Sequence, residues 1–360
     1  MIRPLTAACA VTLLMLWRLV IPTDASAPAA PPIPGIAAAC LPPCPVLDPG
    51  LIPADTEIVL AAVGDIMLAR SIGRALERDG TASPFAAVVD YLANADVTVG
   101  NLECAVAASG QPQRKSYTFR APPVAARVLA AAGFDVVSMA NNHAMDYGAD
   151  ALLESLALLG AAGVRVVGAG ADAEAAHRPA ILDVRGLRLA FLAYVNVPVE
   201  YGGFDTRRWE AGEDRPGLAW GSAAAIERDV AQARRQADLV IVLLHSGYEG
   251  RTAPNRVQQE LARAAIDAGA ALVIGSHPHV LQDMERYGRG GIAYSLGNFV
   301  FDGFSGISNQ SAILRVTLGR EGVRRIEWIP VVIRSGRPQP ATPPVREEIL
   351  RRIERLSQVH

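Results

Sequence analysis

Short, largely apolar segments that alternate with helical segments constrain the fold of this chain more than any other feature of its sequence. Five such segments span residues 58–63, 96–100, 134–140, 239–244 and 270–274. Each leads, directly or within a few residues, to polar side chains that can bind a cation. Because a parallel sheet brings the carboxyl ends of its strands to one edge, the pattern predicts an α/β fold whose polar side chains share one crevice.

Apolar residues spaced three and four apart predict helices over residues 124–132, 151–159, 224–236 and 257–268. Strand, helix, strand order favours right-handed crossovers and a largely parallel sheet. After residue 279 the order changes, because three strands follow one another over residues 291–296, 311–318 and 322–332. These strands predict a second, more antiparallel sheet, and residues 345–358 predict a charged, solvated helix.

The sequence of the N-terminal region is typical of a targeting segment. An apolar run over residues 5–20 follows Arg3, and Ala25-Ser26-Ala27 offers a small-residue cleavage site. We therefore expect residues 1–27 to be a signal peptide or an uncleaved signal anchor, and the protein to be exported to a periplasmic or other extracytoplasmic location. Prolines make residues 28–55 a stiff tether before one domain over residues 56–360.

Composition narrows the class of protein. With 360 residues, 51% of them apolar, the chain can bury a sizeable core. Its 34 basic and 36 acidic residues are nearly balanced, so we expect no nucleic-acid partner and no polybasic membrane patch. An oxidising compartment favours a disulfide between Cys40 and Cys44, which leaves Cys104 as a small buried residue.

The strongest candidate for chemistry is Gly275-Ser276-His277-Pro278-His279, at the end of an apolar run. His277 and His279 can reach one metal centre, since a single proline separates them; the alternative is two ordinary loop histidines. The chain has six histidines, and four of them follow predicted strands. This placement of His143, His245, His277 and His279 favours one common site.

Acidic and amide side chains stand at the ends of other strands. Asp65 follows the first strand and is a hard oxygen ligand, or otherwise a helix cap. Glu103 follows the second strand, where a surface glutamate is the alternative. Asn142 offers an amide ligand in the turn that contains His143, and Asp146 is placed to orient that imidazole, although a helix-opening turn would look similar. Glu249, four residues after His245, is a candidate acid or base.

Two further stretches leave alternatives open. The loop over residues 195–218 contains Tyr201, Phe204, Trp209 and several arginines. It suits a carboxylate-rich or sugar ligand as a lid, or it is a long surface loop with ordinary ion pairs. In residues 294–299, Gly297 permits a bend, and Asn298 satisfies nearby backbone groups or lines the pocket.

Several motifs in order resemble the bacterial capsule-synthesis family of poly-gamma-glutamate biosynthesis proteins, over residues 57–304. They are Gly64-Asp65-Ile66-Met67, Asn101-Leu102-Glu103, Tyr117-Thr118-Phe119-Arg120-Ala121-Pro122, Asn141-Asn142-His143-Ala144-Met145-Asp146-Tyr147-Gly148, His277-Pro278-His279 and Tyr294-Ser295-Leu296-Gly297-Asn298-Phe299. That family is similar to calcineurin-like metallophosphatases. The resemblance implies a four-layer α/β sandwich, in which two mixed sheets are flanked by helices.

The same resemblance implies roles for residues of this chain. His143 stands where the catalytic acid sits, and Zn, Mn or Fe is the implied cofactor, as one or two ions. Metallophosphatases carry Asp-x-His where this chain has Asp65-Ile66-Met67, and a thioether binds hard ions poorly, so we expect occupancy nearer to one ion. The implied metal ligands are Asp65, Glu103, Asn142, His245, His277 and His279.

The functional hypothesis is a cell-envelope, metal-dependent hydrolase of capsule or poly-gamma-glutamate synthesis or export. It would cleave a phosphoester or an amide bond, with an anionic polymer or a phosphorylated envelope compound as substrate and membrane synthase subunits as possible partners. The alternative is a non-catalytic subunit that holds the polymer for a membrane synthase.

Overall fold

The computed structural model describes residues 56–79, 83–200 and 202–357, all within one compact unit, Leu47–His360. The expected targeting segment 1–27, the tether 28–55 and the Cys40–Cys44 pair lie outside the described residues. Cys104 is a free, buried thiol, which confirms that prediction. No helix in the described ranges is both long and apolar enough to cross a membrane.

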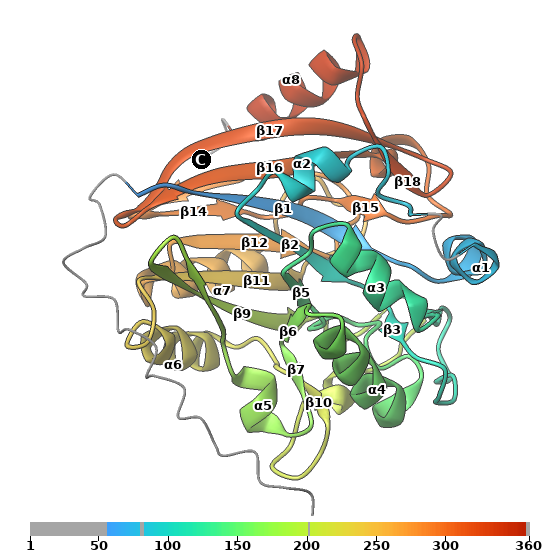
Figure 1. Ribbon diagram of the computed structural model, residues 1–360. Helices are drawn as coiled ribbons and strands as arrows, with labels where there is room; N and C mark the ends of the chain where they lie inside the picture. Colours follow the sequence, from blue (N-terminus) through green and yellow to red (C-terminus); the bar gives the residue numbers. More distant parts are fainter. Residues whose placement is uncertain (1–55, 80–82, 201, 358–360) are drawn as a thin grey trace, which may run out of the picture. The chain divides into compact units, whose positions relative to one another are not determined.

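The first of two large sheets has eight strands and is mixed (Figure 1). Its strands are β1 (Ile58–Ile66), β2 (Val97–Leu102), β5 (Val136–Ser138), β6 (Arg165–Val167), β15 (Asn298–Val300), β16 (Gln310–Gly319), β17 (Gly322–Arg334) and β18 (Arg337–Pro340). β1, β2, β5 and β6 run parallel, and β16 joins β1 on its other side in antiparallel register. β15 lies parallel to one end of β1.

The second large sheet has six strands and is parallel in its middle. Its strands are β8 (Ala180–Val184), β9 (Leu187–Asn196), β11 (Leu239–Ser246), β12 (Leu272–Ser276), β13 (Met284–Tyr287) and β14 (Gly290–Ala293). β9, β11, β12 and β14 run parallel, while β8 and β13 add an antiparallel strand at each edge.

Helices and short strands complete the domain. The helices are α1 (Arg70–Arg78), α2 (Val89–Ala93), α3 (Val124–Ala131), α4 (Gly148–Ala161), α5 (Ala173–His177), α6 (Ala223–Ala233), α7 (Arg256–Asp267) and α8 (Val345–Ser357), with 3₁₀ turns η2 (Thr206–Trp209) and η3 (Gly306–Asn309). The short strands are β3 (Ala105–Val106), β4 (Arg120–Ala121), β7 (Ala169–Gly170) and β10 (Gly217–Leu218). Thus α3, α4, α6, α7 and α8 confirm the helices expected from sequence.

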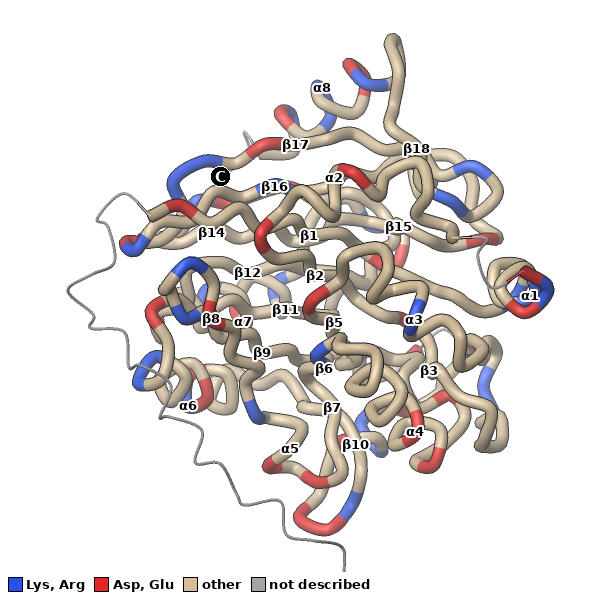
Figure 2. Tube along the Cα trace, in the orientation of Figure 1, with Lys and Arg blue, Asp and Glu red and all other residues tan. Residues whose placement is uncertain are grey.

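Side-chain alternation along the strands explains how the layers pack. In β11, Ile241 and Leu243 belong to a core cluster shared with β1, whereas Val242 and Leu244 belong to a second cluster with α6 and α7. Successive residues of a strand point to opposite faces, so one face of the second sheet meets the first sheet and the other meets helices. Charged residues lie mainly on helices and loops, and the strand centres are mostly uncharged (Figure 2).

The expected α/β architecture of two mixed sheets flanked by helices is therefore confirmed, but the assignment of strands to sheets differs from the sequence prediction. The late strands β16 and β17 were expected in a separate antiparallel sheet, and they instead extend the sheet of β1. β11 and β12 were expected beside β1 and form the second sheet. Apolar periodicity shows that a strand is buried, and it does not identify the strand that it pairs with.

Helix α8 confirms the predicted C-terminal helix, although it is not wholly solvated. Ile349 and Ile353 are buried and form a small apolar cluster with Leu281 and Ala312. The helix packs on β17 of the first sheet and on β13 of the second. It thus contacts an edge of both sheets with one apolar face, as the spacing of Ile349 and Ile353 allows.

Candidate metal centre

The predicted polar residues meet at the carboxyl ends of strands from both sheets. Those placed by the first sheet are Asp65 at the end of β1, Glu103 just after β2, and Asn142 with His143 after β5; those placed by the second are His245 in β11 and His277 with His279 after β12. All seven are buried. This is the edge at which parallel α/β sheets bind ligands. The order of these residues in the sequence does not show which of them lie next to one another at this edge.

Gly64 allows β1 to bring Asp65 to this edge. A Cβ atom at residue 64 would lie 1.8 Å from the carbonyl oxygen of Gly297, so only glycine permits the close approach. The Asp65 amide donates to the same carbonyl at 2.9 Å. In register, Asp65 then stands between Asn101 of β2 and Asn298 of β15.

Two groups of three side chains place their ligand atoms close enough to hold a cation. Glu103, His245 and His277 form one group, and Asp65, Glu103 and His279 form the other; within each group the atoms lie within 4.8 Å of one another. Glu103 belongs to both groups. The Asn142 side-chain oxygen lies 2.8 Å from His245 Nε2, which places an amide oxygen beside the first group.

Buried polar atoms in these groups fit a cation. Among the described residues, Glu103 Oε1 and His277 Nδ1 are buried and have no hydrogen-bond partner, while His279 Nδ1 lies 3.1 Å from the buried Asp65 Oδ2. A buried polar atom without a partner costs about 1–3 kcal/mol, so native proteins rarely contain two in one ligand group. The set of carboxylate, imidazole and amide ligands suits a divalent transition metal.

The pKa values of two of the three imidazoles agree with a ligand role. Burial, followed by the neighbouring imidazoles, holds the pKa of both His245 and His277 well below the usual value, so both rings are neutral and can donate a lone pair. Burial works to lower the pKa of His279 as well, but the hydrogen bond and charge of Asp65 raise it above the usual value. Burial and the charge of Asp65 raise the pKa of Glu103.

The His-Pro-His turn has an unusual backbone. His277 has φ of 97° and His279 has φ of 56°, both in the left-handed region that residues other than glycine seldom adopt. Such a conformation costs on the order of 1–3 kcal/mol per residue and occurs most often at functional sites. The turn contributes one ring to each ligand group, since His277 joins Glu103 and His245 while His279 joins Asp65 and Glu103.

Three neighbouring side chains hold the ligands in place, and sequence reasoning did not single out two of them. Asn101 donates its amide to Asp65 Oδ1 at 2.9 Å and to Glu103 Oε2 at 3.3 Å. Ser276 Oγ contacts His245 Nδ1 at 2.9 Å. Asn298, expected either to support backbone or to line the pocket, contacts His279 Nδ1 at 2.8 Å. Such partners fix the orientation of a ligating imidazole.

Met67, which replaces an expected imidazole, has a structural contact instead. Its sulfur accepts a hydrogen bond from the Ala69 amide at 3.2 Å, and the side chain is fully buried. Among the described residues, the second ligand group therefore consists of Asp65, Glu103 and His279.

His143 and Asp146 form a pair beside the ligands. His143 Nδ1 lies 2.7 Å from Asp146 Oδ2, and the Phe119 ring stacks on the imidazole with centroids 4.3 Å apart. Burial lowers the pKa of His143 to about 4, although the charge of Asp146 acts in the opposite direction. The ring is thus neutral near pH 7, and with Nδ1 facing Asp146 its Nε2 is the atom left for proton exchange.

Lys115 is a site residue that sequence reasoning missed. Its fully buried ammonium group lies 2.8 Å from Asp146 Oδ1, 2.5 Å from Glu200 Oε1 and 2.6 Å from the Asn142 carbonyl oxygen. It is the only lysine of the chain, while the other 33 basic residues are arginines, and this composition was the available signal. A compact ammonium group fits where a planar guanidinium would not.

The loop over residues 195–218 packs against this lysine. Trp209 and Phe204 place their rings 4.9 Å and 5.4 Å from Lys115 Nζ, and Glu200 supplies one of its carboxylate partners. Trp209 is buried. Phe204 and Trp209 of the loop thus pack against a cation of the same chain, and the exposed Arg207 pairs with Asp205.

A cavity of about 190 Å³ opens beside the two ligand groups. The exposed Glu249 stands at this cavity, and no hydrogen bond or ion pair in the described part of the chain holds it. Its lining is Arg70, Tyr117, Phe119, His143, Glu249, His279, Phe301, Asp302, Gly303 and Phe304. The walls thus contain four aromatic rings together with the imidazoles of His143 and His279.

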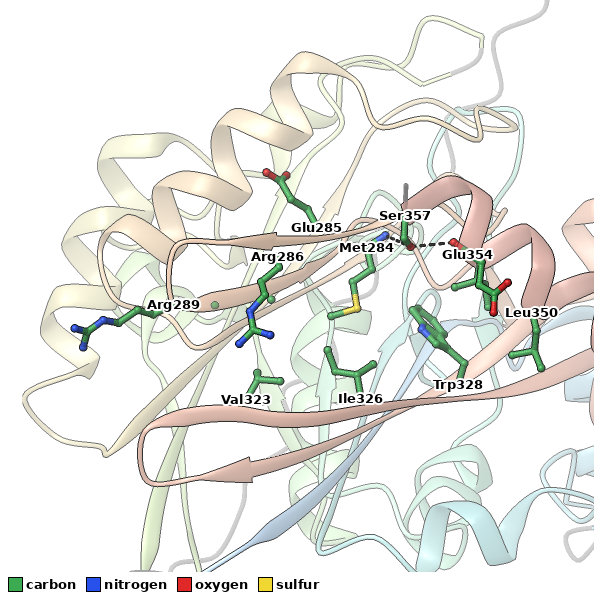
Figure 3. Close-up of a pocket in the computed structure, with 13 residues that line it drawn as sticks. Met284, Glu285, Arg286, Arg289, Val323, Ile326, Trp328, Leu350, Glu354 and Ser357 are labelled. Atoms are coloured by element: carbon green, nitrogen blue, oxygen red, sulfur yellow. Dashed lines mark hydrogen bonds between the residues drawn. The ribbon is translucent and has the colours of Figure 1, made fainter. Parts of the chain in front are cut away.

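A second cavity, of about 590 Å³, lies between β13, β14, β17 and α8 (Figure 3). Met284, Ile326 and Trp328 face it, with Leu350 of α8 opposite and Arg286 near one end. It shares no residue with the cavity beside the ligand groups. Although it is the larger of these two cavities, its described lining residues belong to neither group of possible metal ligands.

Known proteins of capsule synthesis are similar to this chain over most of its length. A family model described as "Bacterial capsule synthesis protein PGA_cap" matches residues 59–303. "Capsule biosynthesis protein CapA" of Bacillus anthracis is 33% identical over 294 residues, which cover 79% of this chain and 70% of that protein. "PGA biosynthesis protein CapA" of Bacillus subtilis (strain 168) is 32% identical over 290 residues, 80% of this chain and 74% of that one.

A relative from Mycobacterium tuberculosis, named as a probable polyglutamine synthesis accessory protein, is 32% identical over 282 residues, which cover 73% of this chain and 72% of that protein. The residues that the family model matches, 59–303, include both ligand groups. The chain belongs to the bacterial capsule synthesis protein family.

Proposed function

We propose that this protein is a metal-dependent hydrolase of the cell envelope that acts in capsule or poly-gamma-glutamate synthesis or export. The observation that carries the proposal is the pair of ligand groups that share Glu103, with His143 and Asp146 beside them. A structural metal site is usually closed, whereas this one adjoins a cavity. The bond cleaved is a phosphoester or an amide, as the resemblance to metallophosphatases and the relatives' names suggest.

Glu103, His245, His277 and the amide oxygen of Asn142 would hold one divalent ion of zinc, manganese or iron. Asp65, Glu103 and His279 would hold a second, with one ligand fewer, so we expect the first position to bind more tightly. When bound, such an ion polarises a phosphoryl or carbonyl oxygen and makes water a better nucleophile near neutral pH. This arrangement supports one firmly held ion and a second, weaker one.

The residues of the chain then provide proton transfer. In hydrolysis the oxygen of water bonds to phosphorus or to the carbonyl carbon, the bond to the leaving group breaks, and the leaving group takes a proton. His143 Nε2 would relay that proton, because the Nδ1–H donates to Asp146 and leaves Nε2 free: it would accept the proton that the attacking water loses and pass it to the leaving group. Asp146 fixes the tautomer of the ring and Lys115 in turn fixes Asp146. Glu249 at the cavity is a second candidate for proton exchange.

The names of the relatives suggest the biosynthetic process in which this protein acts. Two are named for capsule or PGA biosynthesis and a third as an accessory protein of polymer synthesis. We propose that the substrate is an anionic envelope polymer or a phosphorylated envelope compound, that membrane synthase subunits are partners, and that the protein acts outside the cytoplasm.

Elemental analysis of the purified protein and two variants tests the proposal. We expect His277→Ala with His279→Ala to remove the metal and lower the thermal midpoint, because a ligand bound only by the folded state stabilises it, by about 2.7 kcal/mol at one hundred times its Kd. His143→Ala should keep the metal and lose roughly 10²- to 10⁴-fold in hydrolysis of a phosphodiester or of the native polymer.

His177→Ala is a matched control, since His177 pairs with Asp229 and belongs to neither ligand group. It should change neither the metal content nor the rate. If the wild type contains no metal and takes up none from added zinc, manganese or iron, the hydrolase proposal fails. A non-catalytic subunit that holds polymer for a membrane synthase would then take its place.

A further inference from the structure

Among the residues that the structure describes, Arg70 is the one permanently charged cation that lines the cavity beside the ligand groups. The cavity also contains the carboxylates of Glu249 and Asp302, and its other walls are aromatic rings, imidazoles and Gly303. The Arg70 side chain is 34% exposed, so its guanidinium is accessible to a ligand that enters. Neither ligand group includes it.

The surrounding residues hold this guanidinium in one place. Its carbon lies 4.5 Å from the centroid of the Phe119 ring and 5.5 Å from that of Tyr117. Arg70 Nη1 lies 3.5 Å from Asp302 Oδ1, and the other oxygen of Asp302 accepts from the Ser71 amide at 3.2 Å. The backbone of Arg70 has φ of 51°, a strained value for a residue with a side chain.

Gly303 gives a further indication that the position of this side chain matters. A Cβ atom at residue 303 would lie 3.2 Å from Arg70 Nη1, so the glycine keeps the space next to the guanidinium free. A guanidinium has five N–H donors, and the contact with Asp302 is long for a hydrogen bond. Most of its donor capacity is thus left for an anion.

The position of Arg70 relative to His143 defines which part of a substrate it can reach. The Phe119 ring contacts both residues, stacking on His143 with centroids 4.3 Å apart and lying under the guanidinium. An anion on Arg70 would therefore sit one aromatic ring away from the proton-transfer residue. It belongs to a substituent close to the bond that is cleaved, and not to the reacting group itself.

We propose that Arg70 forms a subsite for a carboxylate of the substrate, next to the bond cleaved at the proposed metal centre. This inference rests on the proposed hydrolase function and specifies its substrate class. A singly charged, planar carboxylate matches the fork of the guanidinium. A doubly charged phosphate fits less well, because Glu249 and Asp302 line the same small cavity.

Calorimetric binding to the full-length protein tests the subsite without requiring turnover. The probes are a gamma-linked glutamate trimer, the same trimer with its α-carboxylates converted to amides, and inorganic phosphate. We expect the wild type to prefer the acid trimer, and Arg70→Met to weaken binding of the acid trimer on the order of tenfold to one hundredfold while leaving the amide trimer unchanged. Arg70→Lys should retain part of the preference.

Arg120→Met is the control, since Arg120 stacks on Tyr147 and donates to the carbonyl oxygens of Ala108 and Ser109, away from the cavity. It should leave the preference intact. Equal loss of both trimers in Arg70→Met, loss of phosphate binding alone, or no binding of the acid trimer by the wild type would each overturn the subsite. Absence of turnover with selective binding preserved would overturn the hydrolase and not the subsite.

Discussion

Replacing Lys115 by methionine tests how much of the site depends on one buried charge. Methionine keeps much of the apolar stem against Phe204 and Trp209 and removes the ammonium group. The side chains of Asp146 and Glu200 are 0% and 8% exposed, so neither carboxylate can regain full solvation from water. Removing one partner of a buried ion pair destabilises a protein by about 3–5 kcal/mol, and two carboxylates share this lysine.

We therefore expect Lys115→Met to lower the free energy of unfolding by about 3–5 kcal/mol at pH 7, measured by urea denaturation followed by circular dichroism. Glu200→Gln in the same background should recover part of the loss, because it removes one of the two carboxylates. Lys115→Arg should recover little, since the guanidinium cannot occupy the space of three acceptors that lie 2.5–2.8 Å from the ammonium nitrogen.

The loss should also depend on pH. Burial raises the pKa of Glu200 in the folded state, and the charge of Lys115 works to lower it. Without the lysine the folded pKa rises further, so the folded state binds more protons than the unfolded state from the unfolded pKa of about 4.3 upward. Stability of the variant then falls as pH rises through that window, and its deficit relative to wild type should shrink towards pH 4. A deficit below about 1 kcal/mol at pH 7, the size of a typical surface pair, would refute the reasoning.

Two further outcomes follow from features of the sequence and the structure. Burial raises the pKa of Cys104 to about 12, so this thiol should resist iodoacetamide at pH 8 in the native protein and react after denaturation, as peptide mapping by mass spectrometry would show; rapid native labelling would contradict its burial. The protein recovered from the cell envelope should begin after about Ala27, and mass spectrometry that finds an intact Met1 or Ile2 terminus would establish an uncleaved anchor instead.

Sequence reasoning reached the ligand groups because the carboxyl ends of strands meet at one edge whatever the order of the strands. Asp65, Glu103, His245 and His277 each end or follow an apolar run, and this local feature can be read directly. The division of the strands between two sheets could not be read in this way. β1 and β11 are both continuous apolar runs, and only the packing of the whole chain decides that they belong to different sheets.

Residues that act through tertiary contacts were also beyond local patterns. Lys115 lies in a polar stretch that resembles any solvated loop, and its partners Asp146 and Glu200 are distant in sequence. Arg70 opens a charged amphipathic helix, so it resembles a surface residue. The signal available for Lys115 was composition, because it is a single lysine beside 33 arginines. Gly303 gave no signal in the sequence, since its closeness to Arg70 is seen only in the structure.

The ligands come from two sheets, and this has a consequence for how the protein tolerates change. Asp65 and Glu103 are fixed by strands of the eight-stranded sheet, while His245, His277 and His279 are fixed by the six-stranded sheet. Any ion that binds to either group must cross-link the two layers. Affinity for metal then reports the spacing of the layers, so a substitution in the apolar core between them, at Leu243 for example, can weaken the centre without altering a ligand. Selection for binding would thus extend to core residues that are not themselves ligands.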